Sequence, residues 1–243
     1  TLYEKLGFER VPVFAIKRKN AILADLPVDL AVTRRGALLA RLPGEHEGAR
    51  AVVAHADTIG GMVRDLKPNG RLAVVPVGTH SSRFAEGCRV TILTDDPERT
   101  YAGTVLPLLA SGHAYGDEID TQPAGWDHVE VRVDERCASA ADLADLGIRV
   151  GDFVALDSLP IVTDSGFVNA RHLDGKAGAA AALDALHALC RDGRPDTHEV
   201  HLLVTIAEEV GQGRATGCSR TWPRCCRSTT RCARRATTRS RTG

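Results

Sequence analysis

The sequence predicts an α/β protein: a body with a mixed, mostly parallel sheet and an inserted small β-barrel domain. Three observations predict it. The near-continuous apolar run at residues 49–57 is typical of a buried parallel strand. Short alternating strands separated by Gly, Pro, Asn and Asp recur over residues 64–165, as in small barrels. Helical periodicity and another buried strand return after residue 165.

The first part of the body is rich in strands. Residues 28–34 and 37–42 lie on either side of the turn signal Arg35-Gly36 and predict two strands. The apolar run 49–57 follows and ends in polar residues. In open α/β sheets, ligands bind at the carboxyl ends of such strands. We therefore assign residues 23–63 to the body.

Residues 64–165 form the predicted insert. Strands such as RLAVVPV, CRVTILT and HVEVRVD follow one another at short intervals, with turn residues between them. This pattern is typical of a small barrel or sandwich. One helix interrupts the strands at residues 139–146, with Ser139 as its N-cap and Asp142 at its third helical position, the pattern of a capping box.

The α/β pattern returns over residues 166–213, which we assign to the same body domain. Alanines and leucines recur at helical spacing after Asp174, and Gly193 is a plausible stop. The stretch HEVHLLVTIAEEVG then predicts a second buried strand with two acids at its end.

The two ends of the chain differ from the body. Within residues 1–22, LYEKLGFERVPVFAIKRKN resembles the closing helix–strand unit of a GNAT acetyltransferase, matched by Tyr3, Gly7 and Phe8. This piece is either foreign to the body or an ordinary αβ unit. Residues 214–243 hold nine Arg, seven Thr and four Cys, no Lys, Asp, Glu or His, and no apolar period. We expect this aberrant tail to be disordered.

Charge and hydropathy exclude several classes of protein. The formal net charge is zero over 243 residues, but without the nine tail arginines 22 basic and 31 acidic residues leave the body at −9. An acidic body argues against nucleic acid as a partner. No apolar run approaches the roughly 20 residues of a membrane helix, and no N-terminal signal is present. We therefore expect a cytoplasmic protein with no membrane partner.

Three polar clusters stand at the end of a strand or the start of a helix: His55-Ala56-Asp57, Asp174 and Glu208-Glu209. Alternate strand residues share a face, so Asp57 can hold the His55 ring; equally, His55 fits an ordinary buried histidine. Asp174 is either the N-cap of its helix or a metal-bridging carboxylate. Consecutive acids ending a buried strand are costly unless a metal offsets one and the other serves as a general base.

Together, these clusters resemble those of the tetrahedral-aminopeptidase or glutamyl aminopeptidase family of dinuclear metallopeptidases, which includes endoglucanase-M-like proteins. AHADTIGGMV, LDGKAG and TIAEEVG match the family's A-H-x-D-E-I-G-x-x-V, L-D-D-[RK]-x-G and T-x-x-E-E-x-G patterns. LGIRVGDFVALD is similar to the segment that precedes the return to the catalytic domain. The resemblance covers about residues 30–213. This sequence departs from the family's motifs at Thr58, where Glu is frequent, and at Gly175, where a second Asp is usual.

The resemblance implies a role for each site residue. His55 and Glu209 would bind metal, Asp174 would bridge two ions, Asp57 would orient His55, and Glu208 would be the general base. The implied activity is hydrolysis of an N-terminal peptide bond by a metal-activated water. Two zinc, cobalt or manganese ions suit these ligands, and the substrate would be a peptide or small molecule. The resemblance also implies homo-oligomers, often dodecamers, assembled through the insert.

The tail bears on the expected activity. Family members continue well beyond the paired acids and supply another carboxylate and a late His, neither of which follows Glu209 here. A GC-rich gene that is translated out of frame yields an amino-acid sequence rich in Arg, Cys and Thr. We hypothesise a frameshift near Gly213 and a C-terminally truncated, impaired chain that binds one metal ion or none. The alternatives are a deacylase or carboxypeptidase on the same scaffold, or a non-catalytic assembly subunit.

Overall fold

The structure is a computed structural model that describes residues 23, 25–33, 36–191, 198–212 and 224–226. The chain divides into two compact units, Thr1–Thr58 with His172–Gly243, and Ile59–Arg171. Residues 1–22, with the GNAT-like stretch, lie outside the described residues.

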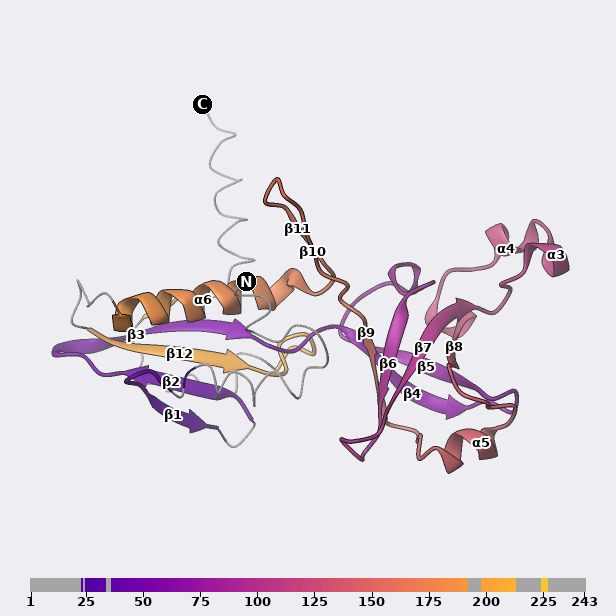
Figure 1. Cartoon of the computed structure of the whole chain (residues 1–243), viewed down its shortest axis with the longest axis horizontal. Helices are drawn as coiled ribbons and strands as arrows, with labels where there is room; N and C mark the ends of the chain where they lie inside the picture. Colours follow the sequence, from indigo (N-terminus) through magenta and orange to yellow (C-terminus); the bar gives the residue numbers. More distant parts are fainter. Residues whose placement is uncertain (1–22, 24, 34–35, 192–197, 213–223, 227–243) are drawn as a thin grey trace. The chain divides into compact units, whose positions relative to one another are not determined.

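The first unit is built on a five-stranded sheet in the order β1-β2-β12-β3-β13 (Figure 1). These strands are β1 (Asp29–Val32), β2 (Leu38–Leu42), β3 (His46–His55), β12 (His198–Thr205) and β13 (Arg224–Cys226). The sheet is mixed: β12, β3 and β13 run parallel, whereas β1 and β12 each pair with β2 in the antiparallel sense. A mostly parallel sheet is therefore not confirmed, because the short β1–β2 turn forces an antiparallel pair.

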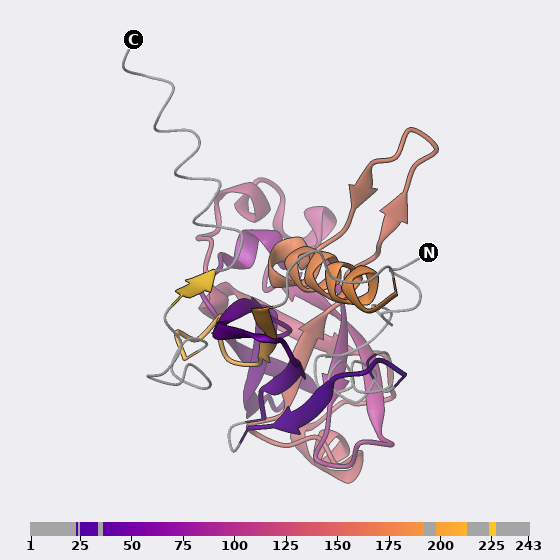
Figure 2. The same cartoon turned by 90° about the vertical axis from the view of Figure 1, so that its left-hand side faces the viewer.

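Among the described residues, a single long helix covers this sheet. Helix α6 (Leu173–Arg191) lies along β3 and β12 in Figures 1 and 2 and buries Leu183 and Leu186 against the sheet. Alternate side chains of β12 share a face, and Leu202 and Val204 belong to this buried cluster. The helix therefore fixes its own first turn beside the carboxyl ends of β12 and β3.

The tail contributes one described element to this sheet. We expected residues 214–243 to lack folded elements, but Arg224–Cys226 form β13 along the outer edge of β3. An unpaired strand edge presents free backbone donors and acceptors, and these three residues pair with it. The rest of the tail lies outside the described residues.

The second unit contains the predicted barrel. Six strands close in the order β4-β5-β8-β7-β6-β9. They are β4 (Gly60–Leu66), β5 (Arg71–Val77), β6 (Arg89–Leu93), β7 (Thr100–Pro107), β8 (Val129–Val133) and β9 (Phe153–Leu156). Their inward side chains, Leu72, Val74 and Ile92 among them, form a separate apolar core. The unit begins before residue 64, because β4 already pairs with β5 from Gly60 onward.

Short elements decorate the barrel. The predicted helix at 139–146 is α5 (Ala140–Asp145), and its capping box of Ser139 and Asp142 is present. The remaining elements are η1 (Ser82–Phe84), α3 (Gly112–Tyr115), α4 (Glu118–Thr121), η2 (Trp126–His128) and a hairpin of β10 (Ile161–Val162) and β11 (Val168–Asn169). Among the described residues, no helix is long and apolar enough to cross a membrane.

Candidate functional site

The site begins at the carboxyl edge of the sheet, where β3 and β12 end side by side. His55 is the last residue of β3 and pairs in register with Thr205, the last residue of β12. Thr205 is buried, and its hydroxyl donates to the Ala54 carbonyl at 3.5 Å. These contacts hold the His55 side chain, only 3% exposed, at the edge where ligands bind in open α/β sheets.

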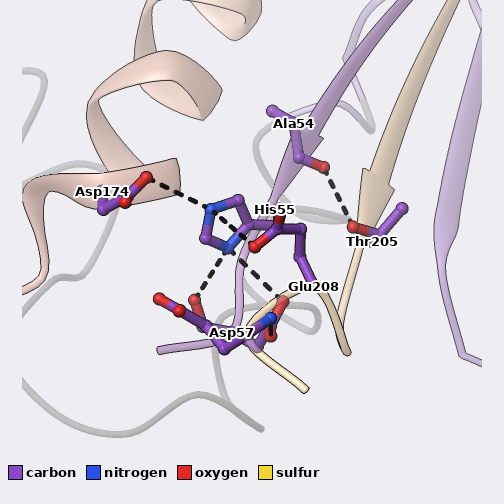
Figure 3. A network of polar contacts seen from close by, with 7 residues as sticks. Ala54, His55, Asp57, Asp174, Thr205 and Glu208 are labelled. Atoms are coloured by element: carbon purple, nitrogen blue, oxygen red, sulfur yellow. Dashed lines mark hydrogen bonds and ion pairs between the residues drawn. The ribbon is translucent and has the colours of Figure 1, made fainter. Parts of the chain in front are cut away.

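One side of the His55 ring faces Asp57. Nδ1 lies 3.1 Å from the Asp57 carbonyl oxygen and 3.5 Å from Asp57 Oδ1, and the other carboxylate oxygen accepts from the Glu209 backbone N–H at 3.0 Å (Figure 3). The strand-alternation argument for this pair was wrong, because β3 ends at His55 and Asp57 stands in the following loop. The loop nevertheless brings the two side chains together.

The other side of the ring faces two more carboxylates. His55 Nε2 lies 3.5 Å from Asp174 Oδ1 and 3.9 Å from Glu208 Oε2 (Figure 3). Both carboxylates are substantially exposed, whereas the ring is buried. The structure therefore places one imidazole among three predicted acids that are far apart in the sequence.

Glycine at position 175 permits this approach. Gly175 has a φ of +70°, and a Cβ there would meet His55 Nε2 and Cε1 at 2.4 Å. Asp174 and Gly175 both leave the helical range before the regular part of α6. Asp174 thus occupies the predicted helix start, and the residue after it is small because the ring fills the space.

The paired acids occupy a turn. β12 ends at Thr205, and Glu208 and Glu209 lie in a turn closed by Gly211 N–H donating to the Glu208 carbonyl at 2.8 Å. The expectation that they end the strand itself was wrong, because the strand stops three residues earlier. In a turn, both carboxylates can approach the same side of the sheet edge without obeying strand alternation.

The local charge balance perturbs the ionisation of the cluster. Burial lowers the pKa of His55, but Asp57 and Glu208 outweigh it and raise that pKa to about 9. Burial raises the pKa of Asp57, but His55 and the backbone N–H groups of Glu209 and Glu208 bring it below its ordinary value. Burial, with neighbouring carboxylates, raises the pKa of Glu209. Excess negative charge therefore surrounds the imidazole.

Sequence reasoning assigned no role to Lys176. Burial lowers the pKa of this lysine to about 8, against the opposing charges of Asp57 and Glu209. The signal was present, because Lys176 stands at the Arg-or-Lys position of the second motif. It supplies a cation beside a cluster that is otherwise rich in carboxylates.

The donor chemistry fits a divalent metal in part. Two ligands of a tetrahedral ion bound at about 2.1 Å lie about 3.4 Å apart, and His55 Nε2 and Asp174 Oδ1 are separated by 3.5 Å. Asp57 Oδ1 is buried and accepts no hydrogen bond within the described part of the chain. However, no group of three or more His, Cys, Asp or Glu among the described residues has the arrangement of a metal site. His55 Nε2 and Asp174 Oδ1 therefore lie at the spacing of two ligands of one ion. No third donor among the described residues completes a metal site with them.

Comparison with known proteins decides the family. The M42 glutamyl aminopeptidase family matches residues 36–224, which include every predicted site residue. The chain belongs to this M42 family. It is 33% identical to the Bacillus subtilis protein named "Putative aminopeptidase YhfE", over 80% of this chain and 56% of that protein. It is 28% identical to the glutamyl aminopeptidase of Lactococcus lactis, over 66% of this chain and 44% of that enzyme.

Solved structures show the same M42 fold. The Pyrococcus horikoshii TET1 peptidase superposes with a TM-score of 0.75 at 23% identity and covers 88% of this chain and 63% of its own. An aminopeptidase from Desulfurococcus kamchatkensis gives a TM-score of 0.74 at 22% identity, over 86% of this chain and 56% of its own. This chain spans about half the length of the curated relatives that it matches.

Proposed function

We propose that this chain is a metal-dependent aminopeptidase that hydrolyses N-terminal peptide bonds. One observation carries the proposal: His55 Nε2 stands at the carboxyl edge of two parallel strands with Asp174 at ligand spacing and Glu208 beside it. This cluster lies inside the span matched by the M42 family, whose named relatives are aminopeptidases. In this proposal the sheet unit is the catalytic domain, and the barrel unit is an insert within it.

Each side chain of the cluster has a proposed task. His55 and Asp174 would hold a divalent ion, and Glu209 would complete that ligand set. A bound ion of this kind polarises a carbonyl and lowers the pKa of a bound water towards about 7. Asp57, at His55 Nδ1, would orient the imidazole and fix which nitrogen faces the ion.

Glu208 is the proposed general base. Its carboxylate is half exposed and lies on the Nε2 side of His55 at 3.9 Å, whereas Asp57 is mostly buried and lies on the Nδ1 side. It would accept the proton of the attacking water and pass it to the leaving amine. The neighbouring Glu209 is less exposed and has a raised pKa, which suits a carboxylate that is neutralised by a cation.

We also propose that the chain associates with copies of itself. The structural relative PhTET1-12s is a dodecamer, and the Pyrococcus horikoshii TET1 peptidase can assemble into a tetrahedron or a large octahedral shell. Self-association does not require catalysis, so the oligomeric state can be measured without substrate.

A paired substitution tests the catalytic proposal. The full chain would be loaded with zinc, cobalt or manganese and assayed on aminoacyl substrates with free and N-acetylated amines. We expect cleavage only of the free amines. Glu208→Gln should lower kcat by about 10²- to 10⁴-fold while metal content stays unchanged, and Glu209→Gln should lose metal. Hydrolysis that survives Glu208→Gln, or that prefers acetylated substrates, would contradict the proposal.

A further inference from the structure

Two histidines lie side by side at the amino ends of β3 and β12. His46 is the first residue of β3 and His198 is the first residue of β12, and the two are register partners in this parallel pair of strands. Their rings meet edge to face, with centroids 5.5 Å apart and planes at 69°. The starts of both strands lie at the end of the sheet opposite to the arrowheads (Figure 1). This histidine pair, His46 with His198, is a group of metal-binding side chains separate from the cluster around His55.

The spacing of the two rings suits one shared ion. Imidazole nitrogens bind zinc at about 2.0–2.1 Å in a tetrahedral geometry. Because the centre of an imidazole ring lies roughly 1 Å behind its nitrogen, two such ligands place their ring centres about 5 Å apart. The observed separation of 5.5 Å is close to this value. A small rotation of either side chain would therefore aim one nitrogen of each ring at the same point.

The histidine pair is also accessible. His46 is exposed and His198 is partly buried, so an ion can reach both rings without any opening of the fold. The regular pairing of β3 with β12 begins only after a shift in register between His198 and Glu199. Irregularities of this kind re-aim side chains at the margins of sheets. The pair thus precedes the regular part of the sheet and faces solvent.

The nearest carboxylate along β12 is engaged elsewhere. Arg41 Nε and Nη2 donate to Glu199 Oε1 at 2.7 Å and Oε2 at 3.0 Å, and His201 Nε2 contacts Oε1 as well. Glu199 would have to break these contacts before it could bind a metal ion. Within the part of the chain that the structure describes, no group of three or more candidate ligands is present. The histidine pair therefore supplies two ligands, and water would supply the others.

The positions of the pair in the sequence give such an ion a structural effect. The chain between His46 and His198 contains the whole barrel unit, Ile59–Arg171. A link that closes a long loop removes conformational freedom from the unfolded chain, and a metal ion that bridges two residues acts as such a link. An ion on the histidine pair would therefore hold the starts of β3 and β12 together across the insertion.

We propose that His46 and His198 together bind one divalent transition-metal ion of the kind that imidazole prefers, such as Ni²⁺ or Zn²⁺. The site is distinct from the cluster around His55, because that cluster lies at the other end of the same strands, about 23 Å away at the usual rise per residue. It also differs in chemistry, because His55 is one imidazole among carboxylates and the new site has two imidazoles. The proposal does not depend on peptidase activity.

Histidine substitutions test whether one ion is shared. Ni²⁺ would be titrated into the full chain by isothermal titration calorimetry. We expect His46→Gln and His198→Gln each to weaken one binding event at least about tenfold, which corresponds to about 1.4 kcal/mol. The double variant should be weakened by much less than the sum of the two effects, since either loss already removes the shared ion. His113→Gln, which changes an exposed histidine of the barrel unit, should bind like the wild type, and the event should survive His55→Ala.

Urea unfolding measures the structural effect of the ion. The comparison would use chains that carry His55→Ala, so that no ion at His55 contributes. Ni²⁺ should raise the unfolding midpoint of this chain, because a ligand that binds only the folded state stabilises it. It should not do so once His46→Gln or His198→Gln is added, with circular dichroism showing that each variant is folded without metal.

Three results would each overturn the proposal: Ni²⁺ binding that neither His46→Gln nor His198→Gln weakens, fully additive effects of the two substitutions, or a midpoint of the His55→Ala chain that Ni²⁺ leaves unchanged. The first would show that the two rings only pack against each other. Peptidase assays of the same samples report on the catalytic proposal separately, because neither histidine of the pair belongs to that site.

Discussion

Charged side chains are arranged differently on the barrel unit and at the carboxyl edge of the sheet. On the barrel, acids meet bases across neighbouring elements, as in the ion pairs Arg64–Asp127, Lys67–Glu130 and Arg89–Asp134. At the sheet edge, His55 alone faces Asp57, Asp174 and Glu208. Lys176 adds one cation to this group. Each of these barrel acids has a basic partner, whereas the sheet edge holds an excess of carboxylates around one imidazole.

This difference indicates which charges support the fold and which support a function. Exposed ion pairs contribute little to stability and need no further ligand. A buried carboxylate is costly, and Asp57 Oδ1 has the His55 ring at 3.5 Å but accepts no hydrogen bond from any residue that the structure describes. The raised pKa values of His55 and Glu209 are further signs that negative charge is in excess. We infer that the sheet edge is completed by a cation, whereas the barrel ion pairs need none.

Removing one histidine from each region should give the largest difference between the two regions, measured as the loss of zinc affinity. His55→Ala removes a proposed ligand, and we expect zinc affinity to fall by more than the about 10- to 100-fold that loss of an outer partner costs. Asp57→Asn should lower zinc affinity by an amount within that range, because it alters only the orientation of the His55 ring. His80→Ala, which removes a barrel histidine packed on Trp126, should leave zinc binding unchanged. Competition with a chromophoric zinc chelator measures all three, and equal loss in His80→Ala would contradict the contrast.

Core substitutions should show that each region is stabilised by its own apolar cluster. Leu72 is buried in the barrel core and Leu183 in the sheet core, and the two belong to separate clusters. Each Leu→Ala change should cost about 2–5 kcal/mol. Hydrogen exchange followed by mass spectrometry would assign the loss of protection: Leu72→Ala should affect barrel strands and Leu183→Ala should affect α6 and β12. Uniform loss of protection in both variants would show a single cooperative unit.

The two regions also differ in how far the sequence predicted them. The barrel follows from local alternation and turn residues, and the capping box of Ser139 and Asp142 is a local signal. His55, Asp57, Asp174 and Glu208 were predicted as one cluster only through the order of three motifs, and the structure brings them together. Their functional roles stay predictions.

Long-range pairing explains what the sequence did not predict. The antiparallel contact of β2 with β12 joins segments about 160 residues apart, and no local pattern specifies its direction. Similarly, the pKa of Lys176 is lowered only because the fold buries this side chain, against the opposing charges of Asp57 and Glu209. Gly175 differs from the family pattern, and its need for a small side chain is visible only with the His55 ring in place.

Substitution of Gly175 should moderately lower both the stability of the sheet unit and its zinc affinity. Gly175→Ala combines a left-handed φ with a clash against the His55 ring, and we expect a loss of about 1–3 kcal/mol together with weaker zinc binding. Gly48→Ala is the control in the same unit, since its φ of +93° is also left-handed and nothing lies within 4 Å of the added Cβ. It should show only the conformational cost. Urea unfolding and zinc titration measure both, and identical behaviour of the two variants would show that the ring does not restrict position 175.

The smallest expected effect is the pH dependence of a barrel ion pair. Arg89, with help from Arg132, lowers the pKa of Asp134 below its ordinary 3.8. Because the folded-state pKa is the lower one, the pair stabilises the protein above the ordinary pKa and loses this contribution as the pH falls through the folded-state value. Asp134→Asn should therefore cost at most about 1 kcal/mol at neutral pH, since both partners are partly exposed. The difference from the wild type should vanish in acid, when urea unfolding is compared at several pH values. A difference that persists in acid would show that packing, and not charge, is what Asp134 contributes, and the balanced pairs of the barrel would then be incidental to its stability.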